Sequence, residues 1–281
     1  MDRPDLRLGI LGLGRMARAL LLPLLESGDL QAAAVDAVVA SEASALRLHQ
    51  ELGIAVGTDP AAAWQAPVLL LAVKPQQLEA LAARRAALDS SGDRAGGAMR
   101  PAAAPQLLIS VLAGVTVARL QRLFPDCHCV RAVPNTPALV RCGLTALAWG
   151  EGIDPEARQW VCRLFSRVGE VLELPEAQLD AFLALTSSGP AFVALVAEAM
   201  ADGAVAAGLP RSLALHLAAR TLAGTAALLD QQALHPALLK DMVASPGGTT
   251  MAGLRQLERT GLRSALLEAV LAAAERSRQL G

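Results

Sequence analysis

Short apolar runs alternate with helix-length stretches over the first part of the chain. Residues 8–11, 34–40 and 67–73 form apolar runs with the length of buried strands, and the stretches 15–27 and 43–52 between them have the length of helices. Strands that alternate with helices of about 10 to 15 residues indicate βαβ units and a parallel sheet. The pattern predicts further strands at 107–112, 129–133, 144–149 and 170–174, with helices at 116–123 and from about residue 154.

The pattern changes after residue 175, where long Ala- and Leu-rich stretches replace the strand-like runs. We predict five helices there, at 190–207, 211–229, 236–243, 250–259 and 263–279. Several are apolar nearly all round, and such a helix must be surrounded by protein. Five helices cannot surround one another, so we expect a homodimer or a higher homo-oligomer; the alternative is an Ala-rich bundle with an ordinary monomeric surface. The predicted domains are 1–174 and 175–281.

Composition narrows the class of partner and of compartment. The chain has 25 basic and 26 acidic residues, which favours a small-molecule partner over nucleic acid or a membrane surface. The N-terminal residues are charged, and we find no continuous apolar run of the roughly 18 residues that a membrane helix needs. Four cysteines are too sparse for a disulfide scaffold. We therefore expect a cytoplasmic protein. Separately, residues 89–105 are rich in Ala, Gly, Pro and Ser, and we expect them to form a surface connection.

A glycine pattern lies between the first predicted strand and helix. The segment Leu11-Gly12-Leu13-Gly14-Arg15-Met16-Ala17 follows the form G-x-G-x-x-A. Gly12 permits the tight turn, Gly14 lets a pyrophosphate approach the backbone, and Ala17 allows close packing of helix on strand. In this context the pattern predicts a Rossmann-type dinucleotide-binding domain, and the chain as a whole is predicted to be α/β with an all-helical C-terminal part.

The type of dinucleotide depends on where the second strand ends. Asp36 would bind the ribose hydroxyls of NAD if that strand ended early. The apolar run instead continues, so we expect the strand to end at Ser41, with Ser44 and Arg47 available to a 2′-phosphate. This arrangement favours NADP, with NADPH preferred and NADH possible.

Two further features could be functional sites or ordinary structural residues. Lys74 follows a predicted strand at the ligand-binding edge of the sheet, where it would face the cofactor or remain a solvated loop residue. Cys127, His128 and Cys129 resemble metal ligands, but alternation along a strand puts His128 on the face opposite the thiols. We predict no metal site.

A second glycine-rich turn, residues 245–250, lies close to the C-terminus. It reads Ser245-Pro246-Gly247-Gly248-Thr249-Thr250 and precedes a predicted helix. Free N–H groups at such a start can bind an anion. The alternative is that Ser245 or Thr249 merely caps the helix.

Six segments, taken together and in order, resemble those of pyrroline-5-carboxylate reductases and span essentially the whole chain. They are residues 12–17, 71–76, 111–114, 130–138, 186–192 and 235–250, of which the last is the most specific. Two departures are Arg15, where the family often has Asn or Gln, and Phe192, where it commonly has Tyr.

The resemblance implies reduction of the cyclic imine 1-pyrroline-5-carboxylate to L-proline, the last step of proline biosynthesis. It implies that Thr250 is catalytic, holding the substrate nitrogen, and that Glu176 lies near the substrate. The predicted substrate site is Glu176, Ser245, Gly247, Gly248, Thr249 and Thr250. The predicted cofactor site combines the first glycine turn and Ser41 with residues of three later turns. Its members are Leu11, Gly12, Leu13, Gly14, Arg15, Met16, Ser41, Ala72, Val73, Lys74, Pro75, Ala113, Gly114 and Asn135.

Two rival functions remain. A 3-hydroxyacid dehydrogenase also joins a Rossmann domain to a helical one, but it uses a lysine of the helical domain, and residues 186–229 contain none. A non-catalytic nucleotide sensor would keep the first glycine turn and would have no reason to keep a hydroxyl-bearing second one.

Overall fold

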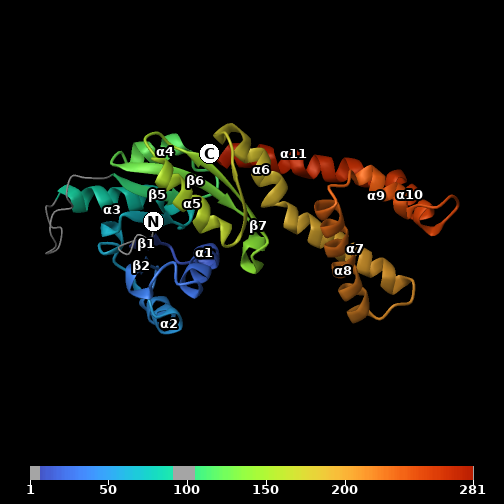
Figure 1. Cartoon of the computed structure of the whole chain (residues 1–281), viewed down its shortest axis with the longest axis horizontal. Coiled ribbons are helices and arrows are strands. Elements are labelled where there is room, and N and C mark those ends of the chain that lie inside the picture. Colours follow the sequence, from blue (N-terminus) through green and yellow to red (C-terminus); the bar gives the residue numbers. More distant parts are fainter. Residues whose placement is uncertain (1–6, 91–104, 281) are drawn as a thin grey trace. The chain divides into compact units, whose positions relative to one another are not determined.

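The computed structural model describes residues 7–90 and 105–280, which fall into two compact units. The sheet unit comprises the described residues up to Ser187 together with those from Ala274 onward, and the helical unit comprises Ser188–Ala273. Figure 1 shows a sheet with helices in the first and only helices in the second. Most of the predicted surface connection, residues 91–104, lies outside the described residues.

The sheet has eight strands in the order β3-β2-β1-β4-β5-β6-β7-β8. All neighbours run parallel except β6 and β7, which are antiparallel. The strands are β1 Leu8–Leu11, β2 Val35–Val38, β3 Ala55–Gly57, β4 Val68–Leu71, β5 Gln106–Ser110, β6 Cys127–Pro134, β7 Gly143–Trp149 and β8 Gly169–Glu173.

Helices cover both faces of the sheet. Those of the sheet unit are α1 Arg15–Glu26, α2 Glu42–Leu52, α3 Leu78–Ser90, α4 Val117–Leu123, α5 Pro155–Ser166 and α6 Leu179–Thr186, with short 3-10 turns η1 Ala32–Ala34, η2 Ala63–Gln65, η3 Pro75–Gln77, η4 Thr136–Val140 and η5 Glu176–Gln178. Alternate residues of β4 enter opposite cores: Leu70 packs in the layer with α1 and α5, and Leu69 in the layer with α3 and α4. Burial on both faces explains why these strands are apolar throughout.

The predicted fold class is confirmed, with five differences in detail. The second strand, β2, ends at Val38 and not at Ser41. The segments β3, α3 and α6 were not predicted as elements. A three-residue strand such as β3 is too short for hydrophobic periodicity to reveal. Periodicity also carries no information on strand direction, so the antiparallel β7 was not foreseen either.

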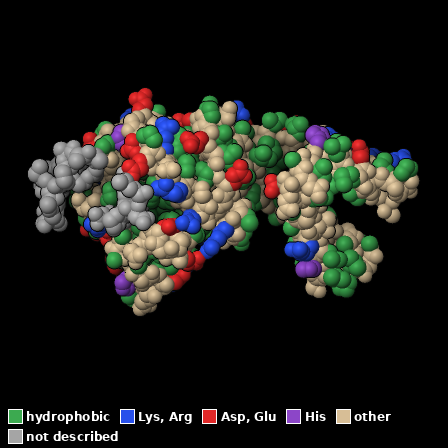
Figure 2. Space-filling model, viewed as in Figure 1, with side chains coloured by type: hydrophobic (Ala, Val, Ile, Leu, Met, Phe, Trp, Pro, Cys, Tyr) green, Lys and Arg blue, Asp and Glu red, His purple; other side chains and the backbone are tan. Residues whose placement is uncertain are grey.

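The helical unit consists of α7 Gly189–Ala206, α8 Arg211–Gln231, α9 Pro236–Val243, α10 Thr249–Arg259 and the first part of α11 Leu262–Leu280. Its one cluster of buried residues is built from small side chains where α7 packs on α8: Ala201, Ala214 and Ala218. Many large apolar side chains lie on its surface, among them Leu195, which is 65% exposed, and Met242, which is 66% exposed. Figure 2 shows hydrophobic side chains along these helices.

Two segments of the chain are long and apolar enough to cross a membrane by length and composition alone. They are Glu176–Ala206 and Arg211–Gln231, and little of either is buried within the chain. The expectation that no apolar segment reaches this length was therefore too strict, because it considered continuous apolar runs and ignored helices with a few interspersed polar residues. Another copy of the chain provides an alternative cover for such helices.

Candidate cofactor and substrate sites

The carboxyl ends of three neighbouring strands are joined at the first glycine turn. The N–H of Gly12 donates to the carbonyl of Val38 at 3.0 Å, and the N–H of Ala72 donates to the carbonyl of Leu11 at 2.8 Å. Gly12 has φ +97°, and a Cβ there would lie 2.7 Å from the carbonyl oxygen of Ala72. Gly12 is therefore required both by its backbone angle and by the close approach of the 72–73 turn.

Helix α1 begins at Gly14 with its first N–H groups free. The first helical bond runs from the N–H of Arg18 to the carbonyl of Gly14 at 3.0 Å, so the N–H groups of residues 15–17 precede the ladder. A Cβ on Gly14 would meet no atom within 4 Å. These features fit a pyrophosphate placed against the backbone at the positive end of the helix.

Side chains of the first glycine turn divide into buried and accessible ones. Leu11 and Leu13 are buried, so only their backbone atoms are available to a ligand. Arg15 is exposed and Met16 half-buried. Among the side chains of this turn, Arg15 alone adds a positive charge beside the free N–H groups.

The end of β2 distinguishes the two predicted dinucleotide contacts. Asp36 lies inside the strand, where its Oδ2 is 2.6 Å from Nη2 of Arg7, and not at the carboxyl end. Ser41 lies at the start of α2, where its hydroxyl accepts from the N–H of Ser44 at 3.3 Å. Although β2 ends earlier than expected, the residues at the ligand-binding edge are serines and not the aspartate.

The turns after β4 and β5 complete this edge of the sheet. The N–H of Lys74 donates to Oε1 of Gln77 at 3.2 Å, which fixes the backbone of the first turn. The side chain of Lys74 is exposed, and no ion pair joins it to another residue in the described part of the chain. In the second turn Ala113 is exposed and Gly114 has φ +72°, a backbone angle that favours glycine.

Asn135 and Glu176 both have protein partners. Nδ2 of Asn135 donates to the carbonyl of Thr186 at 3.0 Å, and its Oδ1 accepts from the N–H of Leu144 at 2.8 Å. Oε1 of Glu176 accepts from the N–H of Val117 at 2.8 Å and from Nη1 of Arg131 at 3.1 Å. Roles of these two residues beside cofactor and substrate stay predictions.

Arg131 was not singled out by the sequence reasoning. Its side chain is 4% exposed, in the middle of β6. The available signal was one charge in an otherwise apolar strand, Val130-Arg131-Ala132-Val133, since a buried charge needs a partner.

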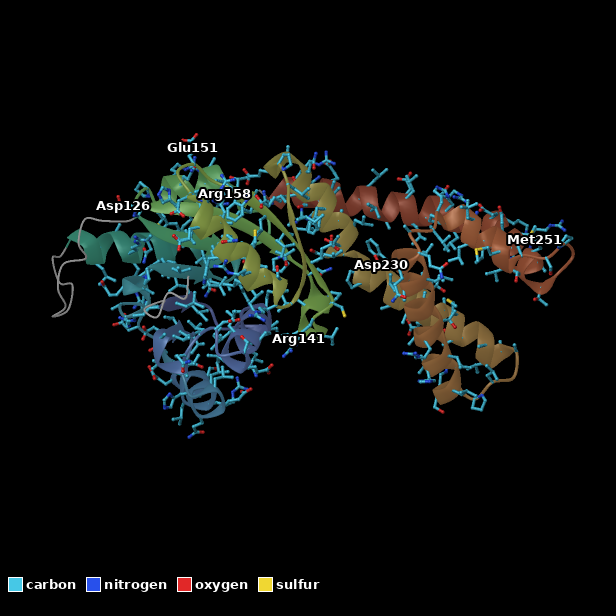
Figure 3. All side chains as sticks on the ribbon, viewed as in Figure 1. Asp126, Arg141, Glu151, Arg158, Asp230 and Met251 are labelled. Atoms are coloured by element: carbon cyan, nitrogen blue, oxygen red, sulfur yellow. The ribbon has the colours of Figure 1, made fainter. Side chains whose placement is uncertain are left out.

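The second glycine turn lies in the helical unit, between α9 and α10. Gly247 has φ +69°, and the N–H of Gly248 donates back to the carbonyl of Ser245 at 3.0 Å. A Cβ on Gly248 would lie 2.4 Å from Oγ of Ser245, so any residue other than glycine would force the Ser245 hydroxyl to move. Thr250 is half-buried, and the neighbouring Met251 is labelled in Figure 3.

Helix α10 begins in the same way as α1. Its N-cap is Gly248, which has no side chain, and the first helical bond runs from the N–H of Ala252 to the carbonyl of Gly248 at 3.2 Å. By contrast, α2, α4 and α5 begin at Ser41, Thr116 and Asp154, whose side chains cap them. The alternative that Ser245 or Thr249 caps α10 is therefore wrong, and the N–H groups of residues 249–251 are available to an anion.

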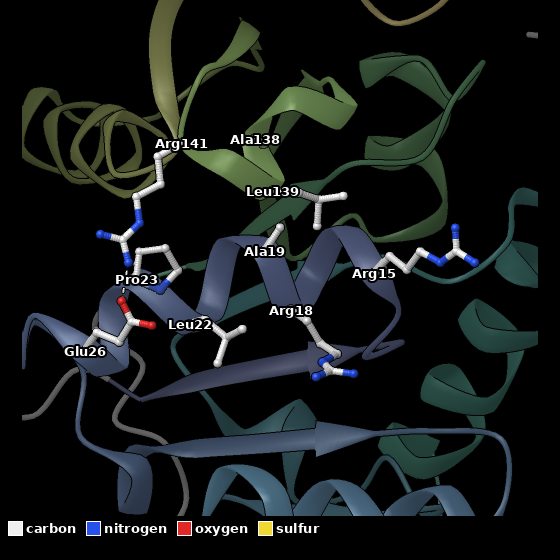
Figure 4. A pocket seen from close by; sticks show the side chains of 9 residues that line it. All are labelled: Arg15, Arg18, Ala19, Leu22, Pro23, Glu26, Ala138, Leu139 and Arg141. Carbon is white, nitrogen blue, oxygen red and sulfur yellow. Dashed lines mark hydrogen bonds and ion pairs between the residues drawn. The ribbon is translucent and has the colours of Figure 1, made fainter. Parts of the chain in front are cut away.

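A groove of about 280 Å³ runs along α1 beneath η4, as Figure 4 shows. Arg141 and Glu26 form an ion pair at one end, and Arg15 lies at the other. Arg15 is the only residue that its lining shares with the predicted cofactor site. The groove therefore borders that site without forming it.

Cys127, His128 and Cys129 of β6 alternate between the two faces of the sheet, as successive residues of a strand do. Cys127 and Cys129 are buried, while His128 is half-exposed and its Nδ1 lies 3.0 Å from the carbonyl oxygen of Glu151. Burial raises the pKa of the Cys129 thiol to about 12, with a further upward contribution from Cys127 and an opposing one from Arg85. The two thiols and the imidazole do not converge.

A Rossmann-type sheet with a glycine turn at the start of α1, followed by a helical unit with its own glycine turn, defines a dinucleotide-dependent oxidoreductase with an added helical domain. Residues 7–94 match the model of the NADP oxidoreductase, coenzyme F420-dependent, family, and residues 176–280 match that of pyrroline-5-carboxylate reductase dimerisation. The chain is 45% identical to the pyrroline-5-carboxylate reductase of Synechocystis, over 99% of both chains. It belongs to the pyrroline-5-carboxylate reductase family.

Solved structures agree with this assignment. The pyrroline-5-carboxylate reductase of Coxiella burnetii has a TM-score of 0.84 and 28% identity, with 99% of both chains covered. The Plasmodium falciparum enzyme, solved with NADP bound, also has a TM-score of 0.84, with 25% identity over 99% of this chain and 98% of that one. The predictions of a nicotinamide dinucleotide cofactor, NAD(P)H, and of a homo-oligomer are confirmed. The two long apolar segments fall within the part matched by the dimerisation model.

Proposed function

We propose that the protein reduces 1-pyrroline-5-carboxylate to L-proline, the last step of proline biosynthesis, with NADPH as the preferred hydride donor. The observation that carries this proposal is the pair of glycine-started helices, α1 at Gly14 and α10 at Gly248. One fits a pyrophosphate and the other the carboxylate of a small substrate. Serines at the end of β2 support NADPH over NADH.

The chemistry needs few charged groups. The reduced nicotinamide supplies a hydride to the imine carbon, and a pyrroline nitrogen is basic enough to carry its proton on arrival. The product nitrogen then keeps that proton, so the protein need not supply a strong acid. What remains for the chain is to orient the substrate and exclude water.

Thr250 is suited to hold the substrate nitrogen. Its hydroxyl can both donate and accept a hydrogen bond, and it lies in the first turn of α10 beside the free N–H groups. We propose that these N–H groups, with Ser245, bind the substrate carboxylate while Thr250 orients the ring nitrogen. In this assignment residues 175–281 provide both substrate binding and dimerisation.

The decisive experiment is an NADPH oxidation assay with 1-pyrroline-5-carboxylate, repeated with NADH. Turnover with NADPH exceeding that with NADH supports the whole proposal. No turnover by folded protein with either cofactor would overturn the assignment of the reaction.

Substitution of Thr250 tests the placement of the second turn. We expect Thr250→Ala to lower kcat/KM by about tenfold or more, the scale of a lost positioning hydrogen bond, while NADPH affinity stays nearly unchanged. Thr250→Ser keeps the hydroxyl and serves as the matched control. An equal loss of NADPH binding in Thr250→Ala would show that the turn holds the cofactor.

The sensor alternative makes a different prediction for binding. NADPH fluorescence is measured with and without a proline analogue. A reductase must bring both ligands together, so the analogue should alter cofactor binding. Binding that is indifferent to the analogue would favour a sensor.

We also propose that the protein works in the cytoplasm. None of its four cysteines, all of which lie in the described residues, forms a disulfide. Reduced thiols fit a reducing compartment. Fractionation of cells that produce the full chain, with enzymatic assay of each fraction, tests this location.

A further inference from the structure

Arg131, on β6, faces the two carboxylates of η5 and α6. Its Nη1 donates to Oε1 of Glu176 at 3.1 Å, and its Nη2 is 3.9 Å from Oδ1 of Asp180. Glu176 begins η5 and Asp180 lies in the first turn of α6. One buried guanidinium on β6 therefore holds both carboxylates of the segment that leads into the helical unit.

The two carboxylates extend this contact to two further helices. Oε1 of Glu176 also accepts from the N–H of Val117, the first residue of α4, at 2.8 Å. Oδ1 of Asp180 accepts from the hydroxyl of Ser277, near the end of α11, at 2.7 Å. We call Arg131, Glu176 and Asp180 the arginine clamp.

The arginine clamp contacts both ends of the turn at residues 111–116, which contains two residues of the predicted cofactor site. Arg131 is paired in the sheet with Ser110, the last residue of β5. The turn that follows, residues 111–116, contains Ala113 and Gly114 and ends at α4, whose first N–H is bound by Glu176. The clamp thus fixes the turn at its start through the sheet and at its end through Val117.

We propose that Arg131 and Glu176 are positioning residues for hydride transfer, which hold the 111–116 turn in place and tie it to the segment entering the helical unit. This inference rests on the proposed function and changes the expected role of Glu176. A carboxylate already engaged with Val117 and Arg131 acts through the cofactor turn and does not bind the substrate directly. A guanidinium suits this task because its two terminal nitrogens can face two carboxylates at once, here with a hydrogen bond to Glu176 and an ion pair with Asp180.

The first test separates a positioning role from substrate contact. Glu176→Gln keeps an acceptor for the N–H of Val117 and weakens the pair with Arg131. We expect kcat to fall about tenfold, part of the hundredfold that a 1 Å misplacement can cost, while KM for 1-pyrroline-5-carboxylate stays within about twofold. A rise in KM with unchanged kcat would show direct substrate binding and overturn the proposal.

The second test removes the cation. We expect Arg131→Met to lower kcat and to weaken NADPH binding, and Arg131→Lys to restore part of both, because lysine keeps the charge but cannot reach two carboxylates. If Arg131→Met does not fold, Arg131→Lys and Glu176→Gln decide the question. Wild-type kinetics in folded Arg131→Lys and Glu176→Gln would overturn the proposal.

The matched control is Arg119→Met. Arg119 lies on α4, two residues after Val117, and pairs with Glu79 at 3.0 Å, but this pair is on the surface. We expect its kinetics to stay at wild-type values. A loss equal to that of Arg131→Met would show a general effect of charge removal near α4 and would contradict the proposal.

Hydrogen exchange at Val117 provides a readout without substrate. Removing the acceptor in Glu176→Ala should speed exchange of this N–H about tenfold relative to its neighbours. Unchanged protection would overturn the clamp. If the wild type shows no turnover, the proposed function fails while this measurement still decides whether the clamp holds the turn.

Discussion

The two units of the chain differ in where they keep their large apolar side chains. In the sheet unit Leu69, Leu70 and Phe165 are essentially inaccessible and belong to cores on either face of the sheet. In the helical unit the buried cluster consists of alanines, and side chains such as Leu195 and Met242 are exposed. The sheet unit contains its own core, whereas the helical unit needs another copy of the chain to cover its surface.

The strongest test of this difference places a charge on each surface. Leu195→Glu in α7 should dissociate the homo-oligomer, because burial of each Leu contributes about 1.5–3 kcal/mol and symmetry counts it twice in a dimer. Sedimentation analysis measures the assembly, and activity should fall with it. Leu46→Glu in α2 is the matched control, since Leu46 is 61% exposed and Leu195 65%. Equal behaviour of the two variants would contradict the comparison.

Shortening a buried side chain in the sheet unit should lower its stability whether or not the chain is assembled into an oligomer. We expect Leu70→Ala to destabilise the sheet unit by about 2–5 kcal/mol, the usual range for a buried Leu. Chemical denaturation at several protein concentrations measures it. The shift should be the same at each concentration, whereas the effect of Leu195→Glu should vary with dilution.

A substitution at Gly14 should affect binding and leave stability nearly untouched. A Cβ there meets no protein atom within 4 Å, so only a ligand would be displaced. We expect Gly14→Ala to weaken NADPH binding about tenfold, roughly 1.4 kcal/mol, with a melting temperature close to that of the wild type. Gly12→Ala is the contrast, because its Cβ would collide with Ala72. We expect this substitution to lower both the affinity for NADPH and the melting temperature.

Sequence reasoning succeeded where the signal was local. The Gly12–Ala17 pattern lies within one turn, and the start of α5 at Asp154-Pro155 follows from a cap and a proline in adjacent positions. It failed where the structure depends on how strands pair. The direction of β7 beside β6 and the short strand β3 beside β2 are set by hydrogen bonding between strands, which residue periodicity does not record.

The candidate site shows the same division. Both glycine turns could be located from the sequence, but the partners of Glu176 could not. Arg131 precedes it by 45 residues and Val117 by 59, and only folding brings them together. The capping alternative at α10 was also open until the backbone showed Gly248, and not Ser245, as the N-cap.

The smallest expected effect concerns the thiols of the sheet unit. Burial raises the pKa of Cys129 to about 12, so this thiol stays protonated at pH values where an ordinary cysteine, near 9.0, has ionised. Because the thiolate is the reactive form, iodoacetamide at pH 9 should label exposed Cys142 well before Cys129, as mass spectrometry can show. Dilution that dissociates the oligomer should leave Cys129 protected. Early labelling on dilution would mean that the sheet unit also opens without its partner.

The bond between Asp180 and Ser277 has a consequence for the architecture of the chain. These residues stand just before the chain enters the helical unit and just after it returns. The helical unit is therefore inserted between two segments of the sheet unit that are hydrogen-bonded to each other. Because α11 runs unbroken from Leu262 to Leu280, the chain returns to the sheet unit within a helix, and the same helix contributes residues to both units.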